Sequence, residues 1–379
     1  MRAIAMTATV FALATGAAHG SGLDRNNTPI DVIFEDGNYA ELSYAVVSPS
    51  VDGRDLLGNR VADVGNDFDV FGVAMKLDFG DKLSFALIYD QPYGSDVAWG
   101  GDPATTLLGG TFATAESDAL TALLKYRATE RISVYGGPRM VSAKGTIGLG
   151  GQAFGPFNGF VADFDTDRGV GAVLGAAYEI PEIAFRAALT WHSEIGLSLN
   201  TTENFPAAAA PALPPGTPTG VPLFTGRTKT EIPQSVKLAL QSGVARNTLV
   251  FGSVRWSEWE KLTLVTPALG SNLSDLDNFL TYEIGVGHRF TERFSASISY
   301  TLDDSSGDDL VSPLAPTDGQ QAVSLGAKFR LNETITLSGG VRYSWLGDAL
   351  PETGTPDMPR ATFDNNDAIS AGVKVGVHF

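Results

Sequence analysis

The sequence has no cysteine, few charged residues and no long apolar run, and each shortage excludes a class of protein. Without cysteine, the 379-residue chain has neither a disulfide framework nor thiolate chemistry. Charged residues make up only 18%, and the 43 glycines are many for this length, which is unlike most soluble enzymes. No run of 18 apolar residues follows the first 20 residues, so no membrane-spanning helix is expected.

Positive charge is also scarce, since the net charge is −17. A chain with this balance has no basic patch to offset phosphate repulsion, so nucleic acid is not an expected partner.

The first 20 residues are typical of a secretory signal peptide. Arg2 supplies a short positive start, residues 3–14 are mostly apolar, and small residues follow. Cleavage after Ala18 and cleavage after Gly20 both fit this pattern. The chain is therefore expected to leave the cytoplasm.

The most informative pattern is an alternation of apolar with small or polar residues. From Ile369 to Phe379 every second residue is apolar or Ala, and the residues between them are small or polar. Successive side chains of a strand point to opposite faces. A final strand that ends on an aromatic residue is typical of bacterial outer-membrane barrels, whose assembly machinery is expected to bind Phe379.

The same alternation recurs in segments of membrane-spanning length. A tilted strand crosses a bilayer in about 9–11 residues. Four clear examples are residues 68–79, 82–90, 182–194 and 334–346.

Short and long connections alternate between these segments. Short turns are predicted at Gly80–Asp81, Thr129–Glu130, Ile180–Pro181, Arg246–Asn247, Thr291–Glu292 and Asn332–Glu333. Long loops are predicted near residues 49–67, 91–117, 145–167, 196–231, 260–277, 303–318 and 347–366. Short periplasmic turns with long outer loops are typical of outer-membrane barrels. We therefore predict an all-β fold: an antiparallel transmembrane β-barrel of about 14 strands, formed by residues 39–379, because lipid leaves no partner for an open sheet edge.

A barrel this wide has a lumen that fills with water unless something blocks it. Residues 21–38 precede the first strand and are the free segment at the periplasmic end. We predict that they form a short N-terminal plug, or hatch.

Three short motifs resemble the FadL/TodX family of outer-membrane transporters for long-chain fatty acids and hydrocarbons. They are residues 21–25 (SGLDR) with 34–38 (FEDGN), residues 41–53 of the first strand and its loop, and residues 89–94 (YDQPYG), which resemble the family's Pro-aromatic-Gly motif through Pro92 and Gly94.

This resemblance implies passive, gated uptake of long-chain fatty acids or other hydrophobic compounds through the outer membrane of a bacterium. The ligand would bind a groove between outer loops, move to a tighter site inside the barrel, and leave when the hatch moves, sideways through a gap in the wall near a kinked third strand. The resemblance places hatch positions at Asn26, Pro29, Phe34 and Gly37. The Asn-Pro-Ala sequence of better-known hatches is absent, which implies a shorter plug.

Two of the predicted outer loops are rich in apolar residues. These are Phe154, Phe157, Phe160 and Phe164 in the first loop, and Phe205, Leu223 and Phe224 in the second. Exposed apolar residues at this density often form a binding surface. The alternative is that they pack on each other as a lid.

A desolvated carboxylate needs a cation. Among the cations with inward parity, Arg139 and Arg342 lie in the outer half of the barrel, where a ligand arrives, and are candidate partners for a fatty-acid head group.

Enzymatic and metal chemistry have little support. A Ser193–His192 pair lacks a third partner. Asp163, Asp165 and Asp167 have calcium-loop spacing, but Leu174 stands at the twelfth position, where a glutamate is expected. Gly169 and Gly171 lie in a strand pattern, where they are expected to relieve crowding or allow curvature. No catalytic residue, metal or cofactor is predicted.

Two functions from different classes stay open. The apolar loops and the plug favour a transporter of hydrophobic compounds, embedded among outer-membrane lipid and lipopolysaccharide. The alternative is a general diffusion porin for small polar solutes.

Overall fold

The structure, a computed structural model, describes residues 23–26, 30–213, 224–304, 309–354 and 356–379. The expected signal segment therefore lies outside the described residues. Apart from short 3-10 turns, the described chain is all β. None of its helical segments is long and apolar enough to cross a membrane.

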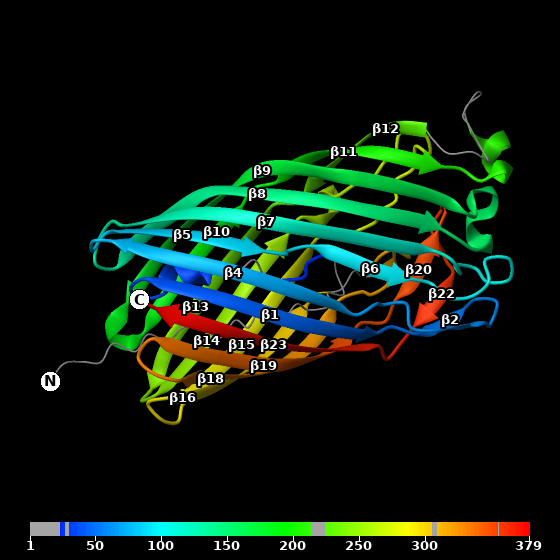
Figure 1. Ribbon diagram of the computed structural model, residues 1–379. Coiled ribbons are helices and arrows are strands. Elements are labelled where there is room, and N and C mark those ends of the chain that lie inside the picture. The colour runs from blue at the N-terminus through cyan, green and yellow to red at the C-terminus, as the bar shows by residue number, and fades with distance from the viewer. Residues whose placement is uncertain (1–22, 27–29, 214–223, 305–308, 355) are drawn as a thin grey trace.

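A single sheet of 17 strands forms the body of the molecule (Figure 1). Its strands are β1 (Tyr39–Ser50), β4 (Phe68–Phe79), β5 (Leu83–Asp90), β6 (Gly94–Ala98), β7 (Phe112–Arg127), β8 (Ile132–Leu149), β9 (Phe160–Ile180), β10 (Phe185–His192), β11 (Ile195–Asn204), β12 (Phe224–Ile232), β13 (Ser235–Ala245), β14 (Thr248–Ser257), β15 (Phe279–Arg289), β16 (Phe294–Asp303), β18 (Gln320–Arg330), β19 (Ile335–Leu346) and β23 (Asp367–His378).

The sheet closes on itself because β1 pairs antiparallel with both β4 and β23. Three spanning strands are each interrupted, so that two consecutive segments lie in line. The third is made of β5 and β6, the seventh of β10 and β11, and the eighth of β12 and β13. The closed barrel therefore has 14 spanning strands, which confirms the predicted fold class.

The apolar face of the alternating strands points outward, as in a barrel that lies in lipid. On β23, Ile369 and Val373 are more than half exposed, whereas Ala368 and Ser370 are buried. The apolar face therefore points outward and the small or polar face lines the lumen, the reverse of a water-soluble barrel.

All six short turns lie at the predicted positions, at one end of the barrel. Three predicted loops are too long. β8 and β9 continue to Leu149 and from Phe160, β11 and β12 occupy much of residues 196–231, and β6 and the start of β7 lie within residues 91–117. Strands of 18 and 21 residues exceed the length needed to span lipid. These strands therefore extend beyond the bilayer, where they pair with each other.

Short elements cover the long-loop end. They are β2 (Gly53–Asp55), β3 (Arg60–Val61), β17 (Leu310–Val311), β20 (Leu350–Thr353), β21 (Met358–Pro359) and β22 (Ala361–Phe363). The remaining elements are the 3-10 turns η1 (Asp31–Phe34), η2 (Gln152–Phe157), η3 (Pro181–Ile183), η4 (Ala207–Ala212) and η5 (Trp259–Lys261). We call the cluster that packs around Trp99 and Phe363, whose rings stack at 5.2 Å, the outer cap.

Asp55 organises one side of the outer cap. Its carboxylate accepts hydrogen bonds from the backbone N–H groups of Leu57, Asn59 and Leu107, and from the Asn59 side chain. Burial alone would raise the pKa of the Asp55 carboxyl, but these hydrogen bonds outweigh burial and hold the pKa below its ordinary value of 3.8. A carboxyl with a lowered pKa stabilises the fold above its ordinary pKa, and the effect is lost as the pH falls through the lowered value.

We expect Asp55→Ala to loosen the outer cap at neutral pH, by roughly 2 kcal/mol or more, because hydrogen bonds to a charged group are lost. Hydrogen exchange of residues 53–64 should accelerate in this variant. The wild-type cap should loosen only below pH 3.8. The control is Asp52→Ala, since Asp52 forms an exposed ion pair with Arg60 at 3.6 Å and should matter little. Equal exchange rates in the two variants would contradict this role for Asp55.

Candidate functional site

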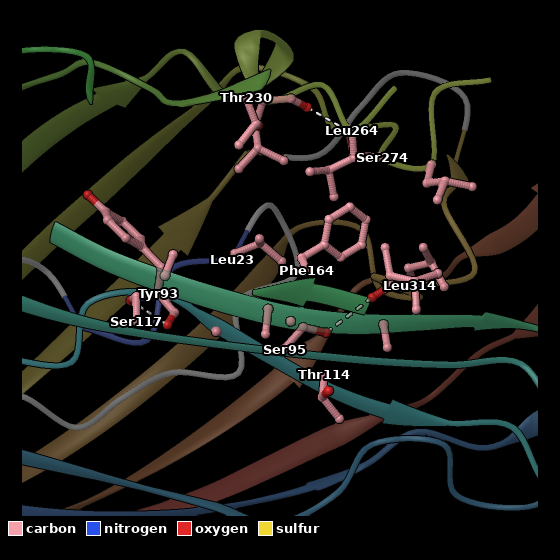
Figure 2. A pocket seen from close by; sticks show the side chains of 18 of the residues that line it. Leu23, Tyr93, Ser95, Thr114, Ser117, Phe164, Thr230, Leu264, Ser274 and Leu314 are labelled. Carbon is pink, nitrogen blue, oxygen red and sulfur yellow. Dashed lines mark hydrogen bonds between the residues drawn. The ribbon is translucent and has the colours of Figure 1, made fainter. Parts of the chain in front are cut away.

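A cavity of about 120 Å³ lies inside the outer part of the barrel (Figure 2). Its lining is almost entirely apolar and is contributed by strands and loops that are distant in sequence. The larger lining side chains from the barrel include Tyr93, Phe164, Leu197, Leu199, Ile232 and Trp259. Leu264, Leu273 and Leu314 from the outer loops complete it.

The cavity exists because part of its wall, on β7 and β8, is built from small residues. Ala113 and Ala115 face inward on β7, and Ala143 and Gly145 belong to the neighbouring β8. Small inward side chains leave space that neighbouring strands cannot fill without distorting their ladder. An apolar cavity of about 150 Å³ stays dry and takes up benzene in a protein interior, so this cavity suits a compact hydrophobic ligand.

The N-terminal segment forms the floor of the cavity. Leu23 is one of the lining residues. The backbone of this segment joins the interrupted third strand: Asp24 and Tyr93 form an antiparallel bridge, Arg25 N–H donates to Pro92 O at 2.7 Å, and Gly94 N–H donates to Leu23 O at 2.9 Å.

Asp24 fastens this floor to the opposite wall. The Arg255 guanidinium donates to both Asp24 carboxylate oxygens, at 2.7 and 3.2 Å, and Trp259 Nε1 donates to the same carboxylate at 3.3 Å. Asp24 and Arg255 are both buried. A buried bidentate pair is strongly favoured once formed, because removing either partner leaves an uncompensated charge.

A second polar group lies beside the first. Asn26 donates to Asp90 Oδ2 at 3.4 Å and to Gln91 O at 3.2 Å. Arg139 approaches the same Asp90 oxygen at 3.4 Å and also donates to Thr121. The predicted hatch residue Asn26 and the predicted ligand cation Arg139 therefore meet at one carboxylate.

The interrupted third strand leaves its neighbour on one side. β5 pairs with both β4 and β7, whereas β6 pairs along its length with β7 and meets the chain before β4 through the isolated bridge of Gly65 with Val97. Arg25 lies in this region, with its guanidinium 4.4 Å from the centre of the Phe68 ring. A Cβ at Gly94 would lie 2.4 Å from Arg25 Nε. The predicted motif residue Gly94 thus has to be glycine for Arg25 to occupy this position.

The later part of the N-terminal segment, around Phe34, fills the end of the lumen where the short turns lie. Phe34 packs edge-on against Tyr135 at 5.4 Å, and the Arg186 guanidinium lies 4.3 Å from the centre of the Phe34 ring. Lys76 Nζ donates to Glu35 O and Gly37 O at 2.8 and 3.0 Å. Gly37 has φ of +65°, a conformation that favours glycine.

The phenylalanines of the outer loops divide into two groups. Phe160 and Phe205 are buried, with rings 4.9 Å apart, and Phe157 packs on Phe205 at 6.5 Å. Phe154 is partly buried against this cluster and Phe164 lines the cavity itself. These phenylalanines therefore pack mainly on each other, as the lid alternative expects, and Phe164 also lines the cavity beneath them.

Three predicted residues cannot be placed fully. Pro29 and Leu223 lie outside the described residues, and Phe224 begins β12 although its side chain is not described.

The two predicted cations differ in their surroundings. Arg139 is paired with Asp90. Arg342 donates through Nε to Ser344 Oγ at 3.3 Å, and its buried Nη2 has no hydrogen-bond partner among the described residues. Neither residue lines the cavity.

The polar side chains of Asp163 and Ser193 form hydrogen bonds with neighbouring residues of the barrel. Ser193 Oγ donates to Glu194 O, and Asp163 accepts from Thr146. Over the ranges that the structure describes, no three His, Cys, Asp or Glu residues gather closely enough to hold a metal ion.

Sequence reasoning missed Asp24, Arg255 and Trp259 as a unit. Arg255 has inward parity on β14, which was a usable signal, but 231 positions separate it from Asp24. Only the closed barrel brings the two together.

Comparison with known proteins agrees with the barrel fold and identifies the family. Residues 31–375 match the family described as outer membrane protein transport protein (OMPP1/FadL/TodX). Among curated proteins, none matches this sequence significantly.

Several solved structures have the same fold over nearly the whole chain. A FadL homologue of Pseudomonas aeruginosa is 16% identical, with a TM-score of 0.73 and 96% of each chain covered. The toluene transporter TodX of P. putida is 14% identical, with a TM-score of 0.66, and covers 97% of this chain and 98% of its own. The toluene transporter TbuX of Ralstonia pickettii is 14% identical, with a TM-score of 0.64 and 97% of each chain covered. At these identities the likeness shows the fold alone.

Proposed function

Because the chain belongs to the OMPP1/FadL/TodX family of transport proteins and is an outer-membrane β-barrel, we propose that it takes up uncharged hydrophobic compounds by passive, gated diffusion. The observation that carries this proposal is the apolar cavity, which lies inside the barrel directly on the N-terminal segment. Its volume and lining suit a ligand of about one aromatic ring.

The charges around the cavity support a neutral ligand. Arg255, which bonds the floor residue Asp24, and Arg139, which meets the floor residue Asn26 at Asp90, are each already paired with a carboxylate. A ligand carboxylate would have to compete with these partners. The relatives whose names refer to toluene transport are consistent with this choice.

Residues 21–38 would act as the gate, after removal of residues 1–20 as a signal peptide. Backbone bonds at Pro92 and Gly94, the Asp24–Arg255 pair and the packing of Phe34 support this role. Release would follow when Arg25 and its neighbours leave the interrupted third strand. Assembly would depend on Phe379, and outer-membrane lipid and lipopolysaccharide would surround the barrel.

A long-chain fatty acid is the second candidate ligand. Arg342 favours it, since this buried guanidinium retains one nitrogen without a partner among the described residues and can accept a carboxylate. A general porin for polar solutes is less suited, because Tyr93, Trp259 and Leu23 meet across the lumen.

The test compares three solutes in vesicles whose outer leaflet is lipopolysaccharide. We expect the wild type to admit toluene well above empty vesicles and to exclude sucrose, because an apolar lining favours only the former. Oleate should enter more slowly, and Arg342→Ala should slow oleate alone. Sucrose flux comparable to toluene flux would instead establish the porin alternative, and equal loss of both hydrophobic fluxes would make Arg342 structural.

A further inference from the structure

The Phe34 side chain occupies a shaped site on the lumen wall, in the half of the barrel where the short turns lie. Phe34 is only 9% exposed. It belongs to one buried apolar cluster with side chains from strands that lie side by side in the barrel, among them Ile88 of β5, Leu123 of β7, Val173 of β9 and Ala188 of β10. None of these residues lines the cavity described above, so this is a separate site, which we call the ring socket.

Two cations of the barrel wall lie over the Phe34 ring. The Arg186 guanidinium is 4.3 Å from the ring centre, and Lys125 Nζ is 5.2 Å from it. Both distances are within the range of a cation–π interaction, which strengthens where water is excluded.

Lys125 depends on this ring for a partner. Its side chain is buried, and it forms no hydrogen bond or ion pair within the part of the chain that the structure describes. Asp78 is paired with a different lysine, and Glu179 acts on Lys125 only over a longer distance. The negative face of the Phe34 ring therefore lies where a buried cation would otherwise need an acid.

The third wall of the ring socket is held in place without Phe34. Tyr135 meets the Phe34 ring edge-on, with centres 5.4 Å apart, an arrangement that aromatic pairs prefer. The Tyr135 hydroxyl lies 2.7 Å from Thr190 Oγ1, and a Cβ at Gly175 would lie 2.3 Å from the Tyr135 ring. Since Thr190 and Gly175 belong to neighbouring strands, we expect Tyr135 to keep its position when Phe34 leaves.

The second partner of Arg186 leaves with Phe34. Asp31 pairs with Arg186 at 3.7 Å, and Asp31 and Phe34 both belong to η1. The Asp31 side chain is 34% exposed, so the carboxylate lies at the rim of the ring socket and the aromatic ring lies inside it. When η1 withdraws, the inner position offers two cations and an apolar wall, which suits an uncharged aromatic ring.

We propose that the ring socket is a second ligand site, specific for an uncharged aromatic ring, and that Phe34 fills it in the closed protein in place of the ligand. The inference rests on the proposed function and deepens it, because it selects aromatic compounds over alkanes of the same size. Leu23 at the cavity and Phe34 belong to the same N-terminal segment. Movement of that segment therefore opens the cavity floor and empties the ring socket together, and an aromatic compound bound there prevents Phe34 from returning.

Phe34→Ala with Ala113→Leu isolates the ring socket, because the first change empties it and the second fills the cavity. In calorimetric titrations this protein should bind toluene about tenfold more tightly than methylcyclohexane, which has a similar size but no π face. Adding Lys125→Met and Arg186→Met should abolish the preference. The matched control is Lys237→Met, an inward-facing lysine of β13 that is not one of the cations over the Phe34 ring, which should leave the preference unchanged.

Heat-modifiable gel mobility establishes that each variant is folded. Equal affinity for the two solutes, or no binding by the folded double variant, would overturn the ring socket. Tighter binding of benzoate than of toluene would also overturn it, since the two cations would then form an anion site.

A second readout uses the wild-type protein. Toluene should raise the mean conductance in planar bilayers about tenfold more than methylcyclohexane, because toluene alone competes with Phe34 and shifts the population toward the open state. Equal responses to the two solutes would contradict this competition. If the double variant prefers toluene but wild-type vesicles admit none, the ring socket exists and the proposed function is wrong. If the vesicles admit toluene and the preference is absent, only the ring socket fails.

Discussion

Asp24→Ala should raise the mean conductance of the purified protein in planar bilayers by about two orders of magnitude, because removing one partner of a buried ion pair costs about 3–5 kcal/mol and shifts the population toward the open state. The variant leaves Arg255 buried without its carboxylate partner, and it removes the hydrogen bond that Trp259 donates to the floor. The N-terminal segment then retains its backbone bonds at Pro92 and Gly94 and the weaker contacts of Asn26 and Phe34.

Two further variants separate gating from misfolding. Asp24→Leu with Arg255→Leu removes both charges and should return the conductance close to that of the wild type, since apolar residues replace a buried pair at little cost. Asp31→Ala is the matched control in the same segment, because the Asp31–Arg186 pair is 3.7 Å long and partly exposed. If a correctly folded Asp24→Ala protein conducts like the wild type, this segment is not the gate.

Ala113→Leu should abolish measurable binding of a one-ring hydrocarbon while leaving the barrel intact. The added side chain points into the cavity that the small residue leaves open. Burying an aromatic ring removes about 150–250 Å² from water. At about 25 cal/mol per Å² this is worth about 4 kcal/mol, or between two and three orders of magnitude in Kd.

Calorimetric titration with toluene measures this effect, and heat-modifiable gel mobility confirms folding. The matched control is Ala327→Leu on β18, between the exposed Leu325 and Phe329 on the lipid side, which should bind like the wild type. Undiminished binding by Ala113→Leu would place the ligand elsewhere in the barrel.

The sequence by itself determined the architecture of this protein. Alternation along a strand and turn residues such as Gly80 are local signals, so the 14 strands and all six short turns follow from neighbours in the chain. The sequence also indicated Phe34 and Gly94. It did not indicate where β8 and β9 end. Beyond the bilayer the outward side chains of a strand are polar, so its sequence resembles that of a loop even though its inward side chains remain apolar.

Only the tertiary structure decided the site. Asp24 meets Arg255 because closure of the barrel, and not spacing in the sequence, sets which inward side chains face each other across the lumen. The same holds for Arg139, whose partner Asp90 comes from a different strand and turns a candidate ligand cation into part of the floor. The path of the interrupted seventh strand is likewise tertiary: Gly169 and Gly171 of β9 leave room for it, and Ile195 and Leu197 pack into that room beside the cavity.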